Sequence, residues 1–374
     1  MRSDGLHVAV VGGGIFGATA AVELARHGHR VELFERANDL LTAASGINQY
    51  RLHRGYHYPR SRTTAIECRD SEPEFRRAFP EAVVESPDHF YAISARDSLT
   101  SADEYLRFCE ALELEVEIDS PAVLRPDAVS LAIRGRETLF DPAVLRRLVW
   151  EQLRATGVKV HLETEVRPDD LRGFETSVVA TYAEVNRLAP DVAGARPVYQ
   201  FEICEKPVVR LPAAYKTDSV VVMDGPFMCF DPLAETGLFV LGNVVHAVHQ
   251  RSIGRVPDVP AEYADLLNQG IVERPSITNI DRFISEGMEY FEGFDQAEHV
   301  GSMFTIRAVL PGVDRTDERP TLVRQIDERT ITVFSGKIDT CIRAAESVAD
   351  LVDAQAGKTG DRGADTRRRV VDQR

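Results

Sequence analysis

A glycine-rich turn between an apolar segment and a helical pattern constrains the fold of this chain more than any other feature. Residues 8–11 are small or β-branched and apolar, as in a strand buried on both faces. Gly12 then makes the tight turn, Gly14 lets the backbone approach a pyrophosphate, and Gly17 lets the following helix pack on the strand. The segment therefore predicts a dinucleotide bound at a helix N-terminus.

The residues after this turn complete the same unit. Residues 18–27 follow a helical pattern, Gly28 is placed as the residue that ends it, and residues 31–34 predict a second buried strand. Glu35 follows about 20 residues after the glycines, where a carboxylate accepts hydrogen bonds from ribose hydroxyls. An acid at this position disfavours the 2′-phosphate of NADP. The cofactor contacts predicted here are Gly12, Gly14, Ile15, Phe16, Gly17, Glu35 and Arg36.

Composition limits the possible partners and the compartment. The chain has 374 residues, enough for one large domain and a smaller one, and its net charge of −15 disfavours nucleic acid as a partner. Its five cysteines are widely spaced, without a CxxC pair, which is typical of a reducing compartment and predicts no metal site. No apolar run is long enough to span a bilayer, and the first strand starts too early for a signal peptide. We therefore expect a cytoplasmic protein, whose oligomeric state stays open.

The order of predicted elements indicates an interrupted nucleotide-binding domain. Asp141 caps an amphipathic helix that starts at Pro142, and short buried strands follow at residues 158–162 and 177–181. A final strand, glycine turn and helix occupy residues 330–352. The intervening regions carry alternating strands and several prolines, which predict an antiparallel sheet with a substrate cavity. The expected division is a nucleotide-binding domain of 1–89, 141–197 and 295–356, a substrate domain of 90–140 and 198–294, and a disordered tail of 357–374.

Four segments together resemble the D-amino-acid oxidase superfamily of FAD-dependent oxidoreductases, which includes glycine and sarcosine oxidases and L-2-hydroxyglutarate dehydrogenase. They are the N-terminal turn, the loop 45–58, the pair Asp141-Pro142 and the turn Ser335-Gly336-Lys337. The loop reads SGINQYRLHRGYHY and is similar to the hydroxyglutarate branch without a gap. The resemblance covers roughly residues 6–352. It implies an α/β fold with a Rossmann-type FAD-binding domain and a second, mainly antiparallel substrate domain.

The resemblance also implies how FAD is held. Backbone N–H groups at residues 335–337 would face the N1 and C2 carbonyl edge of the flavin. Covalent relatives carry a cysteine where this chain has Ser302, which implies non-covalent FAD. Amine-oxidising relatives hold a lysine over the flavin, and the corresponding segment 241–246 has none, which argues against fast reaction with oxygen. The further FAD contacts implied are Ser45, Gly46, Asn48, Gln49, Val166, Gly336, Lys337 and Ile338.

Several polar side chains are candidates for the chemistry. His53 either orients the flavin or acts as a base, and its alternative is a core histidine bonded to a backbone carbonyl. Arg307 is expected to enter the cavity and hold a substrate carboxylate through two parallel hydrogen bonds. Arg51 and Arg54 are equally consistent with that role and with salt bridges. Lys337 either places positive charge at the flavin edge or faces solvent.

A group of aromatic and histidine side chains is expected to line the cavity roof. It consists of Tyr58, His57, His246 and His249. His249 is more typical of an ordinary strand. The two histidines of segment 246–249 have no cysteine or acid nearby in the sequence, so no metal is assigned. The predicted catalytic residues are His53, Arg307, Tyr58 and His246.

The function predicted from the resemblance is hydride transfer from a C–N bond of a small amine or amino acid to flavin N5. The substrate is expected to be small, polar and to carry a carboxylate or an amine. One alternative is oxidation of a 2-hydroxy acid or of a sugar C–OH, favoured by the gapless second loop. The other is a non-catalytic flavoprotein of a biosynthetic assembly. The intact residues Glu35, Ser45, Asn48 and Gly336 argue against that second alternative.

Overall fold

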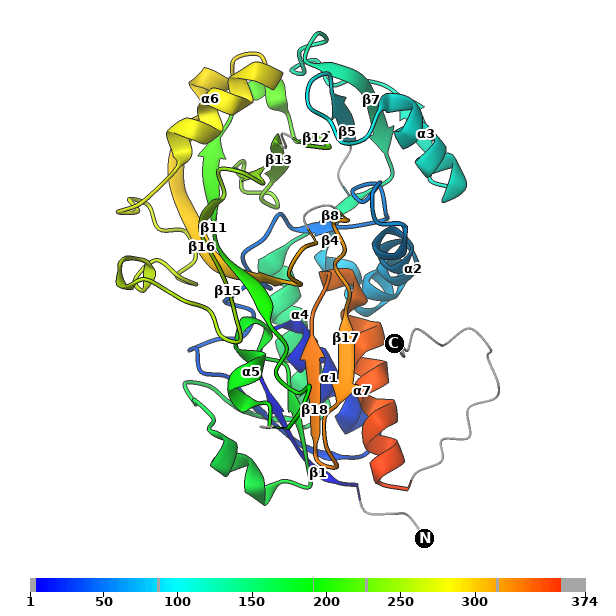
Figure 1. The fold of residues 1–374 in the computed structure, drawn as a ribbon, viewed down its shortest axis with the longest axis vertical. Coiled ribbons are helices and arrows are strands. Elements are labelled where there is room, and N and C mark those ends of the chain that lie inside the picture. The colour runs from blue at the N-terminus through cyan, green and yellow to red at the C-terminus, as the bar shows by residue number, and fades with distance from the viewer. Residues whose placement is uncertain (1–4, 86–87, 191, 226–227, 314–315, 358–374) are drawn as a thin grey trace.

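The computed structural model describes residues 5–85, 88–190, 192–225, 228–313 and 316–357. The tail predicted to be disordered lies outside the described residues from residue 358 on. Within the described chain the helices are α1 (Ile15–Arg26), α2 (Arg62–Ala78), α3 (Ala102–Ala111), α4 (Pro142–Ala155), α5 (Val185–Leu188), α6 (Ile280–Tyr290) and α7 (Cys341–Gln355). Figure 1 shows α1 and α7 together in one half of the molecule, and α3 and α6 at the opposite end.

The first sheet has the arrangement that the N-terminal turn predicts. Its order in the described residues is β17 (Leu322–Gln325), β18 (Thr330–Phe334), β10 (Thr176–Val179), β1 (His7–Val11), β2 (Arg30–Phe34) and β9 (Lys159–His161). All neighbours are parallel except β17 and β18. Every residue of β10, and all but the first of β1, is buried, as strands covered on both faces must be. The Rossmann-type prediction is confirmed.

Local signals position the helices that cover this sheet. Helix α1 begins at Ile15, three residues before the predicted start, because Ile15 and Phe16 already bury their side chains behind the glycine turn. Gly28 follows it with a φ of +86°, a conformation that glycine adopts without strain. Helix α4 begins as predicted, since the Asp141 carboxylate accepts hydrogen bonds from the backbone N–H of Ala143 and Val144.

The second sheet is larger and mainly antiparallel. The described strands follow the order β15 (Val248–Gly254), β11 (Tyr199–Arg210), β14 (Phe239–Asn243), β13 (Met228–Pro232), β12 (Ser219–Met223), β5 (His89–Ser94), β7 (Val129–Gly135) and β6 (Val116–Ile118). Only β12 and β5 pair in parallel on this path. A short third sheet joins β3 (Arg51–Leu52), β8 (Thr138–Phe140) and β4 (Val83–Val84). The prediction of a mainly antiparallel second sheet is confirmed.

Strand β16 (Glu298–Val309) corrects one predicted domain boundary. It pairs with β11 over nearly its whole length, from Glu298 opposite Arg210 to Val309 opposite Gln200. Residues 298–309 therefore belong to the larger sheet rather than to the nucleotide-binding segment that was expected to start at residue 295. The remaining boundaries stay a proposal. This pairing carries Thr305 and Arg307 to the edge of the space between the two sheets.

Candidate functional site

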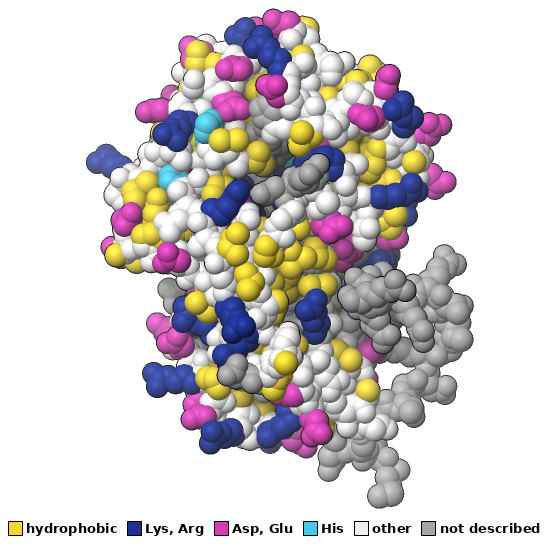
Figure 2. Space-filling view, viewed as in Figure 1, with side chains coloured by type: hydrophobic (Ala, Val, Ile, Leu, Met, Phe, Trp, Pro, Cys, Tyr) yellow, Lys and Arg dark blue, Asp and Glu magenta, His cyan; other side chains and the backbone are white. Residues whose placement is uncertain are grey.

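A cavity of about 780 Å³ lies between the two sheets. Its lining comes from the carboxyl ends of β1 and β2, the start of α1, the loop 43–58, the segment 164–168, strands β11 and β16, and the turn 335–338. The carboxyl edge of a parallel sheet is where open α/β folds bind ligands. Figure 2 shows apolar side chains across the middle of one face, bordered by lysines and arginines, although the chain is acidic overall.

The glycines of the N-terminal turn meet steric demands that other residues cannot. Gly12 has a φ of +110°, and a Cβ there would lie 2.5 Å from the carbonyl oxygen of Ala180. A Cβ on Gly17 would lie 1.9 Å from the carbonyl oxygen of Gly12. Gly14 is the N-cap of α1 and has no side chain with which to cap it, so the helix start faces the cavity with only the Ile15 N–H satisfied by a side chain, that of Ser45. This is the geometry in which a helix N-terminus receives a phosphate.

Glu35 is held in place at the end of β2. Its Oε2 accepts a hydrogen bond of 2.6 Å from the Gly13 backbone N–H, and its Oε1 accepts one of 2.8 Å from that of Ala37. The side chain also lines the cavity. A carboxylate oxygen accepts more than one hydrogen bond, so the fixed group retains capacity for ribose hydroxyls.

Polar side chains at the start of the loop 45–58 bind it to the N-terminus of α1 and stabilise its own turn. Ser45 Oγ accepts a hydrogen bond of 3.0 Å from the Ile15 N–H. The Asn48 amide donates to the Ala44 and Ser45 carbonyls, and its Oδ1 accepts from the Tyr50 N–H at 2.6 Å. Asn48 therefore shapes the loop from within and also lines the cavity, so its predicted contact with the cofactor stays a prediction.

The structure brings most of the predicted cofactor residues to one cavity. Those that line it are Gly12, Gly14, Ile15, Phe16, Glu35, Arg36, Ser45, Asn48, Gln49, Val166, Gly336, Lys337 and Ile338. Gly17 and Gly46 do not line it, since both provide close packing behind the lining. A Cβ on Gly46 would lie 2.0 Å from the carbonyl oxygen of Leu41. The contacts of the lining residues with a cofactor stay predictions.

The donor and acceptor groups of the cavity fit an extended dinucleotide. Four of its lining residues carry buried polar atoms that have neither a hydrogen bond nor an ion pair in the described part of the chain: Gln49 Oε1, the Tyr58 hydroxyl, Thr181 Oγ1 and Asn243 Nδ2. Buried polar groups are almost always satisfied in a folded protein, so orphaned atoms beside a large cavity indicate a ligand with polar edges. The cavity volume also lies within the range of small-molecule sites.

His53 lines the cavity and contacts a carboxylate rather than a backbone carbonyl. Its Nδ1 lies 3.0 Å from Oε1 of Glu137, a side chain that is wholly buried. Burial holds the pKa of His53 well below its usual value, and the positive charges of Lys337 and Arg51 act in the same direction. The imidazole is therefore neutral at physiological pH. The alternative of a core histidine bonded to a carbonyl is wrong.

Arg51 and Arg54 are engaged elsewhere and do not offer a free anchor for a carboxylate. Arg51 is buried and its Nε lies 3.2 Å from Oδ1 of Asp231, while its Nη2 donates to Cys229 Sγ at 3.2 Å. Burial opposes its charge, but Asp231 more than compensates and raises the pKa of Arg51. Arg54 does not line the cavity, and its guanidinium donates to the Arg136 carbonyl.

Arg307 does line the cavity, as predicted, but it already contacts a carboxylate of the protein. Its Nε and Nη2 lie 2.6 and 2.5 Å from Oε2 of Glu202. Arg251 approaches the other oxygen of Glu202 at 3.1 Å from the opposite neighbouring strand. Two guanidinium groups thus share one carboxylate across β15, β11 and β16. Arg307 is therefore already paired with an acid of the protein.

Tyr58 and Lys337 meet at the turn 335–338. The Lys337 Nζ lies 4.8 Å from the centre of the Tyr58 ring, and both residues line the cavity. Burial lowers the pKa of Lys337 to about 8, and Arg319 acts in the same direction. The alternative of a solvent-facing Lys337 is therefore wrong.

The prediction that His246 lines the cavity roof is wrong, whereas His249 lies outside the cavity lining, as its position on an ordinary strand predicted. Asn243 Oδ1 accepts hydrogen bonds from the backbone N–H of Val245 and His246, which closes a turn. The His246 ring lies outside the cavity lining and contacts Glu286 of α6 at 2.8 Å. His249 likewise contacts a distant acid, Glu205, at 2.7 Å. Neither pairing forms part of a possible metal site, because no group of three such ligands exists among the described residues.

Lys206 is the cavity residue that the sequence analysis missed. It lies on β11, which pairs with β14, the strand where the segment 241–246 begins. Its half-buried side chain lines the cavity and has no hydrogen bond or ion pair with any described residue. Burial lowers the pKa of Lys206, and the charges of Arg307 and Arg51 add to the effect. The alternation of Glu202, Cys204 and Lys206 on one face of a strand was the available signal.

We predict that Glu35→Ala weakens FAD binding about 5- to 150-fold, because the ribose hydroxyls of bound FAD would lose their carboxylate acceptor at a cost of about 1–3 kcal/mol. Titration of apoprotein with FAD measures the dissociation constant. Glu165 lines the same end of the cavity without a hydrogen bond to the described residues, so Glu165→Ala is the matched control. Equal dissociation constants for Glu35→Ala and the wild type would exclude the role in ribose binding.

Comparison with known proteins identifies relatives of this chain. Residues 7–202 match the model of the DAO family, described as FAD dependent oxidoreductase. The FAD-dependent monooxygenase kojA of Aspergillus flavus is 28% identical over 93% of this chain and 86% of its own length. The FAD-dependent monooxygenase FPY4 of Fusarium mangiferae is 28% identical over 93% of this chain and 91% of its own length. Glycine oxidase from Geobacillus kaustophilus has the same fold, with a TM-score of 0.70 and 19% sequence identity. The match covers 93% of this chain and 95% of the glycine oxidase chain.

Within the described residues, no helix combines the length and the apolar character needed to cross a membrane.

Proposed function

The chain belongs to the DAO family of FAD-dependent oxidoreductases, and on that premise we propose that it oxidises the C–N bond of a small amine or amino acid that carries a carboxylate. FAD supplies an isoalloxazine ring that accepts a hydride. The residues proposed to hold it are Glu35 at the ribose, the start of α1 at the phosphates and the turn 335–338 at the ring edge.

The observation that carries this proposal is the unpaired ammonium of Lys206. Most other cations of the cavity are neutralised by carboxylates of the protein. These pairs are Arg51 with Asp231, Arg60 with Asp224, Arg319 with Asp317, and Arg307 with Glu202. Lys206 has no such partner among the described residues. A cation in a partly desolvated cavity needs an anionic complement, and the carboxylate of a substrate supplies it.

The same charge favours chemistry at nitrogen. Positive groups around a bound amine disfavour its ammonium form, so the amine is held neutral with a free lone pair. That lone pair is what an amine needs to lose a hydride from the adjacent carbon. The charge of Lys206 acts in this direction.

We expect Lys206→Met to raise the KM for a carboxylate substrate tenfold or more, about 1.4 kcal/mol, because the charge-assisted contact is lost. The experiment is anaerobic bleaching of the bound flavin with panels of amino acids, amines and 2-hydroxy acids, followed by kinetics on the best substrate. Lys159→Met is the control, since Lys159 lies on β9 and is exposed at the surface. An unchanged KM in Lys206→Met would show that Lys206 does not bind the substrate carboxylate. Bleaching by amines without a carboxylate, and by no other substrate, would refute the proposal that the substrate carries one.

A second candidate function is oxidation of a C–OH bond in a 2-hydroxy acid. The observation that favours it is the neutral imidazole of His53 in the cavity wall with a carboxylate behind it. An alcohol needs its hydroxyl proton removed, which histidine does well. Bleaching by 2-hydroxy acids, but not by amines of the same shape, would select this function. Failure of every substrate in the panels would leave the non-catalytic alternative.

We predict that the bound FAD is extractable. Ser302 stands where covalent relatives carry a cysteine, and its hydroxyl donates a hydrogen bond of 2.6 Å to Glu205, away from the cavity lining. Acid precipitation should therefore release the yellow colour into the supernatant. Colour that stays in the pellet would show a covalent bond at another residue.

A further inference from the structure

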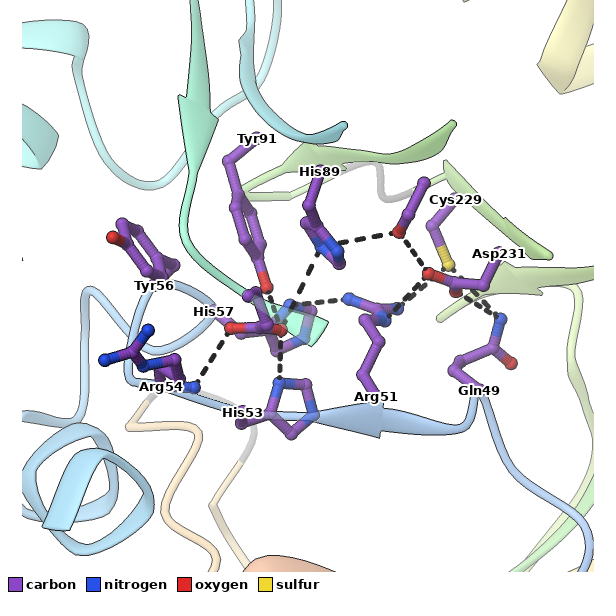
Figure 3. Close-up of polar contacts among 12 residues, drawn as sticks. Gln49, Arg51, His53, Arg54, Tyr56, His57, His89, Tyr91, Cys229 and Asp231 are labelled. Atoms are coloured by element: carbon purple, nitrogen blue, oxygen red, sulfur yellow. Dashed lines mark hydrogen bonds and ion pairs between the residues drawn. The ribbon is translucent and has the colours of Figure 1, made fainter. Parts of the chain in front are cut away.

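His53 is backed by a buried carboxylate that no sequence pattern indicated. Glu137 precedes β8 and its side chain is wholly buried. Its Oε1 accepts hydrogen bonds from the Tyr91 hydroxyl at 2.6 Å and lies 3.0 Å from His53 Nδ1, while its Oε2 accepts from the Arg54 backbone N–H at 3.1 Å. Figure 3 shows the labelled side chains of His53 and Tyr91 close together, with dashed contacts leading from both toward the same place.

These contacts determine which nitrogen of His53 carries the proton. Both oxygens of Glu137 already accept hydrogen bonds, one from the Tyr91 hydroxyl and one from the Arg54 N–H, so we infer that the ring likewise donates to Oε1 through Nδ1–H. In a neutral imidazole the other nitrogen, Nε2, then keeps a free lone pair. Nε2 has no hydrogen-bond partner among the described residues, and Figure 3 shows it on the side of the ring away from the Nδ1 contact.

Three neighbours of His53 disfavour its charged form: Lys337, Arg51 and His89. The rings of His57 and Tyr58 also contact it, and Glu137, the acid in contact with Nδ1, acts in the opposite direction. Burial is the largest influence on the pKa of His53 and lowers it well below 6.5. His57 and His89 are also shifted to low pKa, chiefly by burial, and are neutral in the same range.

We propose that Glu137 is a positioning residue that holds His53 with Nε2 free toward the cavity, and that His53 accepts the proton that leaves the substrate heteroatom. This inference rests on the proposed function. The substrate C–H bond breaks and its electron pair leaves as hydride to FAD, the oxidant. The N–H or O–H bond breaks, its electron pair becomes the second bond of the imine or carbonyl, and its proton binds Nε2.

Tyr91 provides a matched control for Glu137. It donates to the same carboxylate oxygen as His53 but does not line the cavity. Tyr91→Phe removes one hydrogen bond from Glu137 and leaves the contact with His53. A purely structural carboxylate would respond similarly to the loss of either neighbour. A positioning carboxylate makes the properties of His53 depend on Glu137 and much less on Tyr91.

The first test measures the tautomer of His53 without any substrate. Holoenzyme labelled with ¹⁵N-histidine is compared with His53→Asn to identify the resonances of His53. We expect the proton on Nδ1 in the wild type and in Tyr91→Phe, and a mixture of tautomers in Glu137→Gln, because an amide both donates and accepts. A proton on Nε2 in the wild type, or an unchanged spectrum in Glu137→Gln, would overturn the assignment.

The second test measures the rate of anaerobic flavin reduction against pH with the substrate found in the panels. Glu137→Gln should lower the limiting rate about 10- to 100-fold, as is typical for a residue that orients a catalytic group, with unchanged substrate affinity. The apparent pKa of the rate should fall, since a negative neighbour of the histidine is lost. If Glu137→Gln has the same limiting rate and the same pH profile as the wild type, the proposal is refuted.

Two further measurements distinguish a loss of folding in Glu137→Gln from a loss of the positioning of His53. Flavin content and thermal unfolding show whether Glu137→Gln is folded, and Glu137→Asp replaces it if it is not. The shorter side chain keeps the charge but loses reach to Nδ1, so the same mixed tautomers and slower reduction are expected. If no substrate bleaches the wild type, the proposed function fails, while the tautomer measurement still decides the role of Glu137.

Discussion

Gly17→Ala should yield protein without bound FAD. The added Cβ would lie 1.9 Å from the carbonyl oxygen of Gly12, and that carbonyl belongs to the turn that feeds α1. Neither partner is a flexible side chain, so the helix must move away from the strand and its N-terminus from the phosphates. We expect FAD affinity to fall at least about 100-fold, about 2.7 kcal/mol. The ratio of flavin to protein after purification, and titration of the apoprotein, measure it.

The control for this substitution is Gly173→Ala. No atom outside its chain neighbours lies within 4 Å of a Cβ at Gly173, and its backbone is not in the left-handed region. This variant should bind FAD like the wild type. A full complement of flavin in Gly17→Ala would mean that the helix is not held by this close contact, and the steric interpretation of the glycine turn would fail.

The dinucleotide half of the fold was predictable because its signals are local. The apolar strand, the glycines and the acid that ends the second strand lie within residues 8–35, and the structure places β1, α1 and β2 there. The cap at Asp141 depends on the next three residues only. Each of these signals follows from backbone sterics or from one short-range hydrogen bond, so the sequence carries it without knowledge of the fold.

The polar part of the site was less predictable because its contacts join distant segments. Whether Arg51 or Arg307 is available to a ligand depends on Asp231 and Glu202, which only the paired strands bring near. His53 and Glu137 are 84 positions apart. No periodicity links such residues, and each arginine has the same properties until a carboxylate neutralises it. The position of Lys206 in the cavity is of the same kind, because it depends on the pairing of β11 with β14 and β16 and not on residues near it in the sequence.

Removal of Asp231 should destabilise the protein strongly. Asp231 is wholly buried, and it accepts hydrogen bonds from Ser219 Oγ at 2.5 Å and Gln49 Nε2 at 3.1 Å besides its ion pair with Arg51. Asp231→Ala leaves the Arg51 guanidinium buried without a counter-ion, for which we expect a loss of about 3–5 kcal/mol in the free energy of unfolding. Denaturant titration of holoenzyme at saturating FAD measures this loss.

A double substitution separates the charge effect from the loss of packing. Asp231→Leu combined with Arg51→Met removes both charges and keeps apolar volume, so it should cost less than Asp231→Ala alone. Glu151→Ala breaks an exposed pair with Arg147, in which both side chains are about half exposed, and should change stability by about 0.5 kcal/mol or less. If Asp231→Ala costs no more than Glu151→Ala, water reaches the Arg51 guanidinium. Arg51 would then be accessible from the cavity and would compete with Lys206 as the anchor for an anionic substrate.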